Sequence, residues 1–253
     1  MLKNITKLLS ILFVSFVLTA CGSDEPEKQV ERPAKELYEM ATTAERNGDT
    51  YKDVIKAYEE VERQHPQSDY AKKAIANAVM YAYANMNYED AVMFAENFIA
   101  YNPNHKLAPK ITYIRALSYY EQISDIGRDQ GNTDKAFEAL NDIIISYPNT
   151  DYAINAKYKL DLAIDHLAGK ELDVGRFYQD QGDYQAALTR FNNIVKNYSH
   201  TSQTPEALAR MVETYLALGL YQEAYRTGAI LGHNHQGNYW YRHSYELLQK
   251  HKP

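Results

Sequence analysis

The sequence predicts an all-α superhelix built from repeated helix pairs, and three observations lead to this fold class. Val174–Ser199 has apolar residues at helical spacing on both sides of a short polar turn, as expected for two short helices. The same pattern recurs, giving five copies along the chain. A helix-stopping proline follows three of the first four copies at one fixed distance, with Ser199 in the remaining copy.

The clearest copy shows how such a pair is held together. Gly182 ends the first helix and Asp183 can cap the second. Small residues at Gly175 and Ala187 allow the two helices to approach closely. This combination is typical of the tetratricopeptide repeat (TPR), and we therefore expect a TPR α-α superhelix of about five helix pairs.

The copies align on one small residue in the second helix of each pair, namely Val54, Ala91, Ala136, Ala187 and Ala224. Seven residues later, every copy has an apolar side chain: Val61, Phe98, Ile143, Ile194 and Leu231. The turn between the helices is expected at Gly131, Gly182 and Gly219 in three copies, at Gly48 in the first and at Met86 in the second. The expected helix pairs are 34–47 with 51–65, 71–85 with 88–101, 110–124 with 134–147, a long segment from 153 with 184–198, and 205–218 with 221–231.

Two copies depart from the common length. In the third, Ile123–Thr133 lengthens the loop by eight residues relative to the fourth copy, which predicts a surface excursion and a candidate contact loop. In the fourth, 14 extra residues precede the motif, close to four helical turns. We therefore expect one long helix at Ala153–Gln181, weakened at Gly169 and Gly175. The segment Tyr239–Lys250 is expected to cap the last pair.

The N-terminus is expected to be a lipoprotein signal peptide. Lys3 and Lys7 precede the apolar run Leu8–Leu18, which is too short to span a bilayer, and Leu18-Thr19-Ala20-Cys21 matches a bacterial lipobox. The expected modification is diacylglycerol and an N-acyl chain on Cys21, the only cysteine. Gly22, where many inner-membrane lipoproteins have aspartate, favours the outer membrane. The expected divisions are 1–20 signal peptide, 21–33 lipidated flexible tether, 34–152 TPRs 1–3, and 153–253 long helix, TPRs 4–5 and capping helix.

Composition and motifs exclude several functions. A net charge of −6 argues against nucleic acid as a partner. The sequence contains no phosphate-binding loop, nucleophile elbow or other catalytic constellation, so we expect no enzyme. His233, His235 and His243 have no cysteine or paired carboxylate nearby, and we expect neither a metal nor a cofactor besides the covalent lipids.

Two local stretches carry a resemblance to a known family. Tyr113-Ile-Arg-Ala-Leu-Ser and Ile99-Ala-Tyr-Asn-Pro103, together with the lipobox, five TPRs and the lengthened fourth copy, resemble the BamD (ComL) family. These are lipoproteins of the outer-membrane β-barrel assembly machinery. Ala116 replaces the usual glycine of the family and Ser199 the usual proline.

The resemblance implies a non-enzymatic scaffold, lipid-anchored at the periplasmic face of the outer membrane of a Gram-negative bacterium. Its N-terminal repeats would receive unfolded outer-membrane proteins, and its C-terminal repeats would dock the barrel-forming subunit through a periplasmic domain, with accessory lipoproteins as further partners. The expected peptide groove is formed by residues that could equally serve packing between repeats: Tyr38, Met80, Tyr83, Tyr113 and Tyr120. Arg190 is the candidate docking residue, or else a solvated surface arginine.

A second function remains open from the sequence. A periplasmic TPR lipoprotein could instead act as an adaptor for enzymes of cell-wall synthesis or hydrolysis, and the fold by itself does not separate the two. The lengthened fourth copy and the third-copy insertion favour the assembly machinery.

Overall fold

The computed structural model describes residues 31–126, 128 and 130–251, and residues 34–253 form one compact unit. Cys21 and the predicted signal peptide lie outside the described residues. The described part of this unit consists of eleven α-helices: α2 (Ala34–Asn47), α3 (Tyr51–Gln64), α4 (Asp69–Ala84), α5 (Tyr88–Tyr101), α6 (Ala108–Tyr120), α7 (Gly131–Ser146), α8 (Asp151–Asp180), α9 (Tyr184–Asn197), α10 (Thr204–Ala217), α11 (Tyr221–Asn234) and α12 (Tyr239–Lys250).

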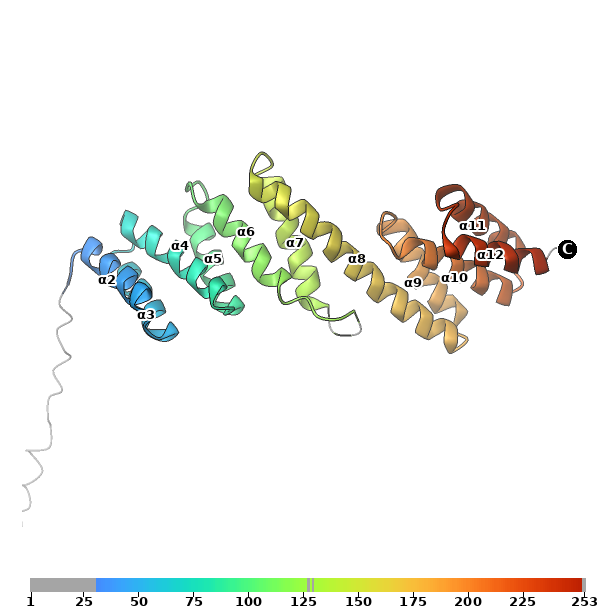
Figure 1. The fold of residues 1–253 in the computed structure, drawn as a ribbon, viewed down its shortest axis with the longest axis horizontal. Coiled ribbons are helices and arrows are strands. Elements are labelled where there is room, and N and C mark those ends of the chain that lie inside the picture. Colours follow the sequence, from blue (N-terminus) through green and yellow to red (C-terminus); the bar gives the residue numbers. More distant parts are fainter. Residues whose placement is uncertain (1–30, 127, 129, 252–253) are drawn as a thin grey trace, which may run out of the picture. The chain divides into compact units, whose positions relative to one another are not determined.

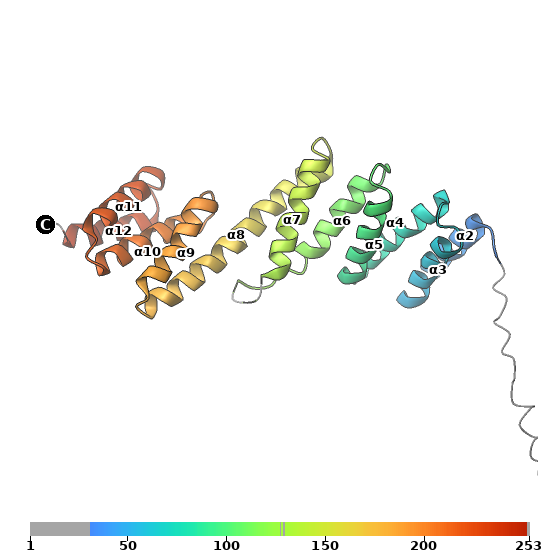
Figure 2. The ribbon, with the colours of Figure 1, turned by 180° about the vertical axis from the view of Figure 1, so that it is seen from behind.

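The helices form five successive pairs, and the predicted TPR superhelix is confirmed (Figure 1). Each first helix packs against its own second helix and against the next first helix, so α2, α4, α6, α8 and α10 share one side of the array. The second helices contact only neighbouring first helices and, for α11, the terminal α12. Figure 2 shows the same order of pairs from behind. No helix in the described ranges is long and apolar enough to cross a bilayer.

The register assigned from the sequence is confirmed by burial. All five small reference residues have no exposed surface, and the apolar residues seven positions later are at most 1% exposed. The predicted helix bounds differ from the observed ones by a few residues. For example, α4 begins at Asp69 because the Ser68 side chain accepts a hydrogen bond from the Ala71 N–H and caps the helix two residues early.

Four of the five predicted turns are confirmed. Gly48, Gly182 and Gly219 have φ between 72° and 78°, and Met86 has φ 59° although its side chain disfavours that conformation. The prediction for Gly131 is wrong, because this residue begins α7. The third pair is joined instead by the ten residues 121–130, where the other pairs have three.

The long loop of the third pair is not a simple surface excursion. Ile126 lies against α8, so close that a Cβ on Gly169 would be 2.7 Å from its Cδ1. The buried Gln130 side chain donates from Nε2 to the carbonyls of Asp125, Ile126 and Arg128 at 3.1–3.4 Å and accepts from the Thr133 hydroxyl. Hydrogen bonds of this kind satisfy the loop's own backbone, which explains how a ten-residue connection packs against a neighbouring helix.

The predicted long helix is present as the 30-residue α8, capped by Thr150. Its first half packs against α7 and its second half against α9. The expected weak points are absent: the helix is continuous across Gly169 and Gly175, and both glycines lie where a neighbour approaches closely. The expected cap, α12, is also present and packs on α10 and α11.

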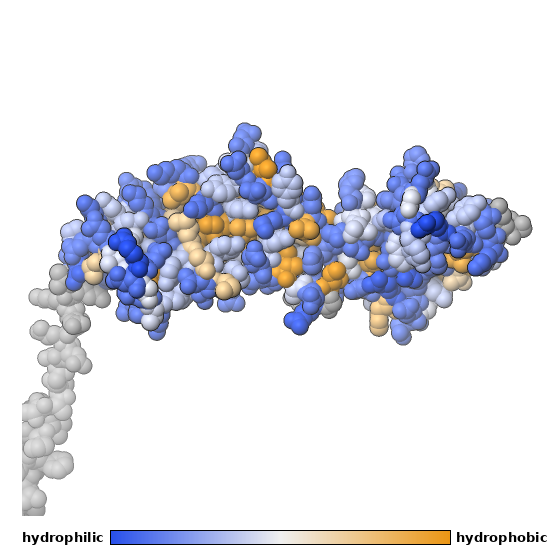
Figure 3. Space-filling view, viewed as in Figure 1, coloured by the Kyte–Doolittle hydropathy of each residue, from blue (hydrophilic) through white to orange (hydrophobic). Residues whose placement is uncertain are grey.

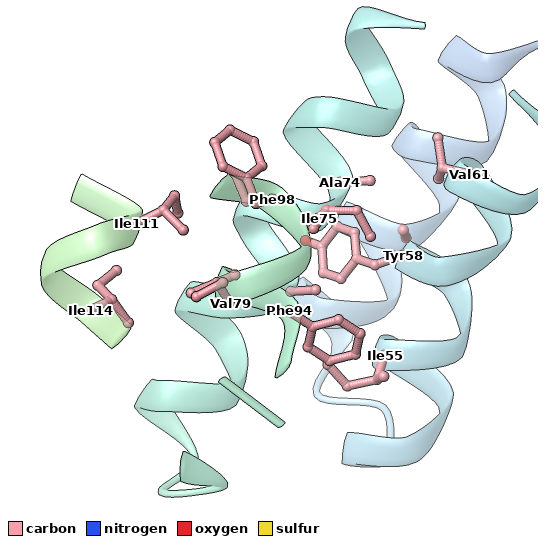
Figure 4. Close-up of a cluster of buried hydrophobic side chains, with 14 of the residues drawn as sticks. Ile55, Tyr58, Val61, Ala74, Ile75, Val79, Phe94, Phe98, Ile111 and Ile114 are labelled. Carbon is pink, nitrogen blue, oxygen red and sulfur yellow. The ribbon is translucent and has the colours of Figure 1, made fainter. Parts of the chain in front are cut away.

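The largest core cluster extends from α2 to α6 (Figure 4). Tyr58 on α3 is fully buried there, and its hydroxyl donates to Glu45. Burial and this hydrogen bond raise the pKa of Tyr58. Hydrophobic and hydrophilic side chains are interspersed on the surface over α4 to α8 (Figure 3).

A glycine-to-alanine change tests the close approach of α8 and α9. A Cβ at Gly175 would lie 2.4 Å from Cε1 of the Phe191 ring. Overpacking costs about 1–3 kcal/mol and the gain in helix propensity returns up to about 1 kcal/mol, so we expect Gly175→Ala to lower the free energy of unfolding by about 1–2 kcal/mol in urea denaturation. Gly237→Ala is the control, because nothing lies within 4 Å of its added Cβ, and it should change stability little. Equal stability of the two variants would contradict the packing.

Candidate functional site

The five predicted groove residues all lie on first helices and are half-buried, but the structure divides them into two groups. Tyr38, Met80 and Tyr83 all pack against the core formed by α2 to α6, and of these three only Tyr83 also lies beside Glu121. The Tyr38 ring lies 5.6 Å from that of Tyr70, and its hydroxyl accepts a hydrogen bond of 3.0 Å from the Asn77 side chain. These contacts give Tyr38 a packing role between α2 and α4.

Tyr83, Tyr113 and Tyr120 belong to the second group, which gathers around the exposed Glu121. Burial first, and the negative charge of Glu121 second, raise the pKa of each of these three tyrosines. Glu121 follows α6 directly, so its carboxylate sits at the end of the helix that carries Tyr113 and Tyr120.

Two residues of α8 complete this group. The Tyr152 ring lies 5.5 Å from that of Tyr113, and Lys159 Nζ lies 4.1 Å from the ring centroid of Tyr120. The second contact is a cation–π interaction. We refer to the set as the Glu121 cluster: Tyr83, Tyr113, Tyr120, Glu121, Tyr152 and Lys159.

Sequence reasoning missed Glu121, Tyr152 and Lys159. For Tyr152 a signal was present: Tyr70 and Tyr152 stand at the same position of two linkers with the same spacing, Pro66–Ala71 and Pro148–Ala153. In the structure, each of these linker tyrosines packs against a tyrosine of the preceding first helix, Tyr38 and Tyr113 respectively. Glu121 and Lys159 had no such signal, because charged residues are common on helix surfaces.

The Glu121 cluster combines aromatic faces with one exposed carboxylate and one lysine on adjacent first helices. Aromatic rings bind apolar and aromatic side chains over a large area, while the two charged groups can pair with charged ends of a ligand. The arrangement is suited to binding a ligand that carries both apolar and charged groups.

Arg190 lies apart from the Glu121 cluster, on α9, which contacts only α8 and α10. Its Nη1 is 3.2 Å from Oε1 of Glu171, and its side chain is 42% exposed. It is therefore neither a freely solvated arginine nor a buried one. Part of the guanidinium remains open to a further acceptor.

The histidines near the C-terminus have separate environments. His243 Nε2 lies 2.8 Å from Glu213 Oε1, whereas His233 and His235 stand at the end of α11. In the part of the chain that the structure describes, no three His, Cys, Asp or Glu side chains come together as a possible metal site.

The fold defines a class: an all-α array of TPR helix pairs. Residues 30–230 match the model of the YfiO family, described as an outer membrane lipoprotein. The chain is 42% identical over 219 residues to the outer membrane protein assembly factor BamD of Caulobacter vibrioides, covering 86% of this chain and 71% of that protein. It is 34% identical over 250 residues to the protein of the same description from Rickettsia prowazekii, covering 98% and 99%. The chain belongs to the BamD family of outer membrane protein assembly factors.

The pKa values of the tyrosines test the Glu121 cluster. We expect Glu121→Gln to lower the pKa of Tyr83, Tyr113 and Tyr120, because removing a neighbouring negative charge makes the phenolate less unfavourable. Titration of the ring carbons by NMR measures this directly. Tyr198 is the internal control, since burial, Glu171 and Asp134 raise its pKa and Glu121 does not. A fall in the pKa of Tyr198 as large as that of the three would contradict the assignment.

Proposed function

We propose that this chain receives unfolded outer-membrane barrel proteins on the first-helix side of its N-terminal repeats, residues 34–152. Its C-terminal part, residues 153–253, docks the barrel-forming subunit of the assembly complex through a periplasmic domain of that subunit. Accessory lipoproteins are further partners. The single observation that carries the first part is the Glu121 cluster, which places aromatic and charged groups on α4, α6 and the first turns of α8, so the site extends as far as Lys159.

The Glu121 cluster suits a peptide better than it suits a folded surface. A TPR array presents its first helices to an extended or helical segment, and aromatic residues there supply most of the contact area. An aromatic side chain of the precursor packs on Tyr83 and Tyr113, and Lys159 offers a partner for a carboxylate. Tyr38 and Met80 lie on α2 and α4 of the same first-helix side and extend the binding surface toward the N-terminus.

Docking of the barrel-forming subunit is assigned to the second half of the chain on the resemblance to the BamD family. Arg190 is the proposed contact. Its guanidinium already holds Glu171, which fixes the side chain in one orientation, and its remaining donors can bind a carboxylate of the partner. An arginine fixed in this way loses less conformational entropy on binding.

We further propose that the chain is held at the periplasmic face of the outer membrane by lipids on Cys21. The lipobox and the family membership support this anchor. Three acyl chains exceed the two signals that stable anchoring needs.

Two substitutions test whether the two binding activities are separate. We expect Tyr83→Ala to weaken binding of a C-terminal barrel peptide by about 1–2 kcal/mol while docking is unchanged, and Arg190→Glu to weaken docking by about 2 kcal/mol while peptide binding is unchanged. Calorimetric titration with the peptide and with the isolated periplasmic domain of the subunit gives both affinities.

Matched controls separate binding from folding. Tyr158→Ala removes an exposed tyrosine of α8 outside the Glu121 cluster and should leave both affinities unchanged. Glu171→Gln breaks the ion pair but keeps the arginine, so docking should persist. If Glu171→Gln reduces docking as much as Arg190→Glu does, Arg190 acts only through the ion pair. If Tyr83→Ala lowers both affinities equally, one surface serves both partners.

The anchor is tested by fractionation. Cys21→Ala should release the protein from the outer-membrane fraction or leave it unprocessed, because no acyl chain can be attached. The variant and the parent chain are compared after a high-salt wash, which removes proteins held only by charge. Retention of Cys21→Ala in the washed membranes would contradict the lipid anchor and would leave the scaffold function untouched.

A further inference from the structure

A cavity of about 570 Å³ is lined by the C-terminal ends of the second helices α3 and α5 and by the N-terminal half of α4. Its polar lining comes from the ends of the two second helices and from α4: Glu62, Gln67, Lys72, Asn97, Tyr101 and Asn102. None of these residues belongs to the Glu121 cluster, and the volume is within the range of ligand-binding sites in proteins.

Glu62 occupies a position that the repeat reserves for apolar residues. It stands eight residues after the reference residue Val54, and the same position holds Ile99, Ile144 and Val195 in the next three second helices. Those three side chains pack partly buried against the core clusters. Glu62 itself is half-buried, so its carboxylate has lost part of its hydration, which is unfavourable unless a partner compensates for it.

The described residues do not provide that compensation. The one hydrogen bond to Glu62 comes from Asn97 Nδ2 and is long, at 3.5 Å. No cation of the described residues lies within ion-pair distance of Glu62, and burial raises the pKa of its carboxyl above the ordinary value. The one basic group in the cavity wall, Lys72, is directed to Asp69 at 3.2 Å.

The rest of the cavity is also suited to a positively charged ligand. Helices α3 and α5 both end beside it, and the C-terminal end of a helix carries a partial negative charge. Helix α4 begins beside the same cavity. The partial positive charge of its N-terminal end is offset by the Ser68 cap and by the carboxylate of Asp69. The amides of Gln67, Asn97 and Asn102 can hydrogen-bond to a peptide backbone, and Tyr101, 81% exposed, stands at the rim.

We propose that this cavity binds an extended segment of a partner protein that places a lysine or arginine side chain against Glu62. The amides hold the backbone of the segment, the Tyr101 ring covers it, and the basic group replaces the water that Glu62 has lost. This is a binding site on the second helices, separate from the first-helix surface that we assign to barrel precursors.

The test uses the full lipidated chain in cells with the photo-reactive residue p-benzoylphenylalanine in place of Tyr101. Irradiation followed by mass spectrometry should identify a crosslinked peptide with a lysine or arginine within a few residues of the attachment point. In the same background, Glu62→Gln should reduce the yield of this product at least tenfold. The crosslinked peptide is then synthesised with its basic residue and with norleucine or citrulline in that place. We expect the uncharged version to bind the purified chain at least tenfold more weakly.

Two further variants keep the proposal falsifiable. Glu62→Ile, which copies the residue of α5 and α7, should raise the unfolding midpoint while abolishing the crosslink, so loss of binding cannot be attributed to misfolding. Glu138→Gln, an exposed glutamate of α7, should leave the crosslink unchanged. The proposal is overturned if no crosslink forms, if the crosslinked peptides lack a basic residue, or if Glu62→Gln gives the same yield as the parent chain.

Discussion

The close approach of the two helices within each pair is the constraint on which the rest of the structure depends. One residue of each second helix has no exposed surface and is small, either alanine or, in α3, valine. At α8 and α9 the approach is so close that a Cβ on Gly175 would lie 2.4 Å from the Phe191 ring. Protein interiors are packed to crystal-like density, so the distance between the two helices of a pair also sets where the first helix of the next pair can pack.

Both departures from the repeat follow from this constraint. The extra 14 residues of the fourth copy lengthen α8 by nearly whole turns, so both of its halves keep a packing face for a second helix, first α7 and then α9. The ten-residue loop of the third pair then packs Ile126 against Gly169 near the middle of α8. Helix α8 is therefore one continuous element shared by the two groups of repeats.

Two carboxylates mark two of the surfaces to which we assign binding. Glu121 stands among tyrosines at the end of α6, and Glu62 replaces an aliphatic residue on α3. Glu62 makes the isolated chain less stable than an aliphatic residue would, because its carboxylate has lost part of its hydration. Glu121 is exposed, and its charge keeps the neighbouring tyrosines in their neutral form. The two surfaces use different helices of the same array, which allows a scaffold to hold more than one partner at a time.

The sequence by itself determined the repeat register, the five pairs and the long helix, because these depend on local periodicity and on small residues at fixed spacing. It also indicated the family through residues such as Tyr113 and Pro103. It misplaced the turn at Gly131, since a loop stabilised by the Gln130 side chain leaves no periodic signal. Of the candidate groove residues, only the tertiary structure separated Tyr38, held by Tyr70 and Asn77, from Tyr83, Tyr113 and Tyr120 around Glu121. The environment of a side chain on a helix surface depends on which other helices pack beside it, and those helices are distant in the sequence.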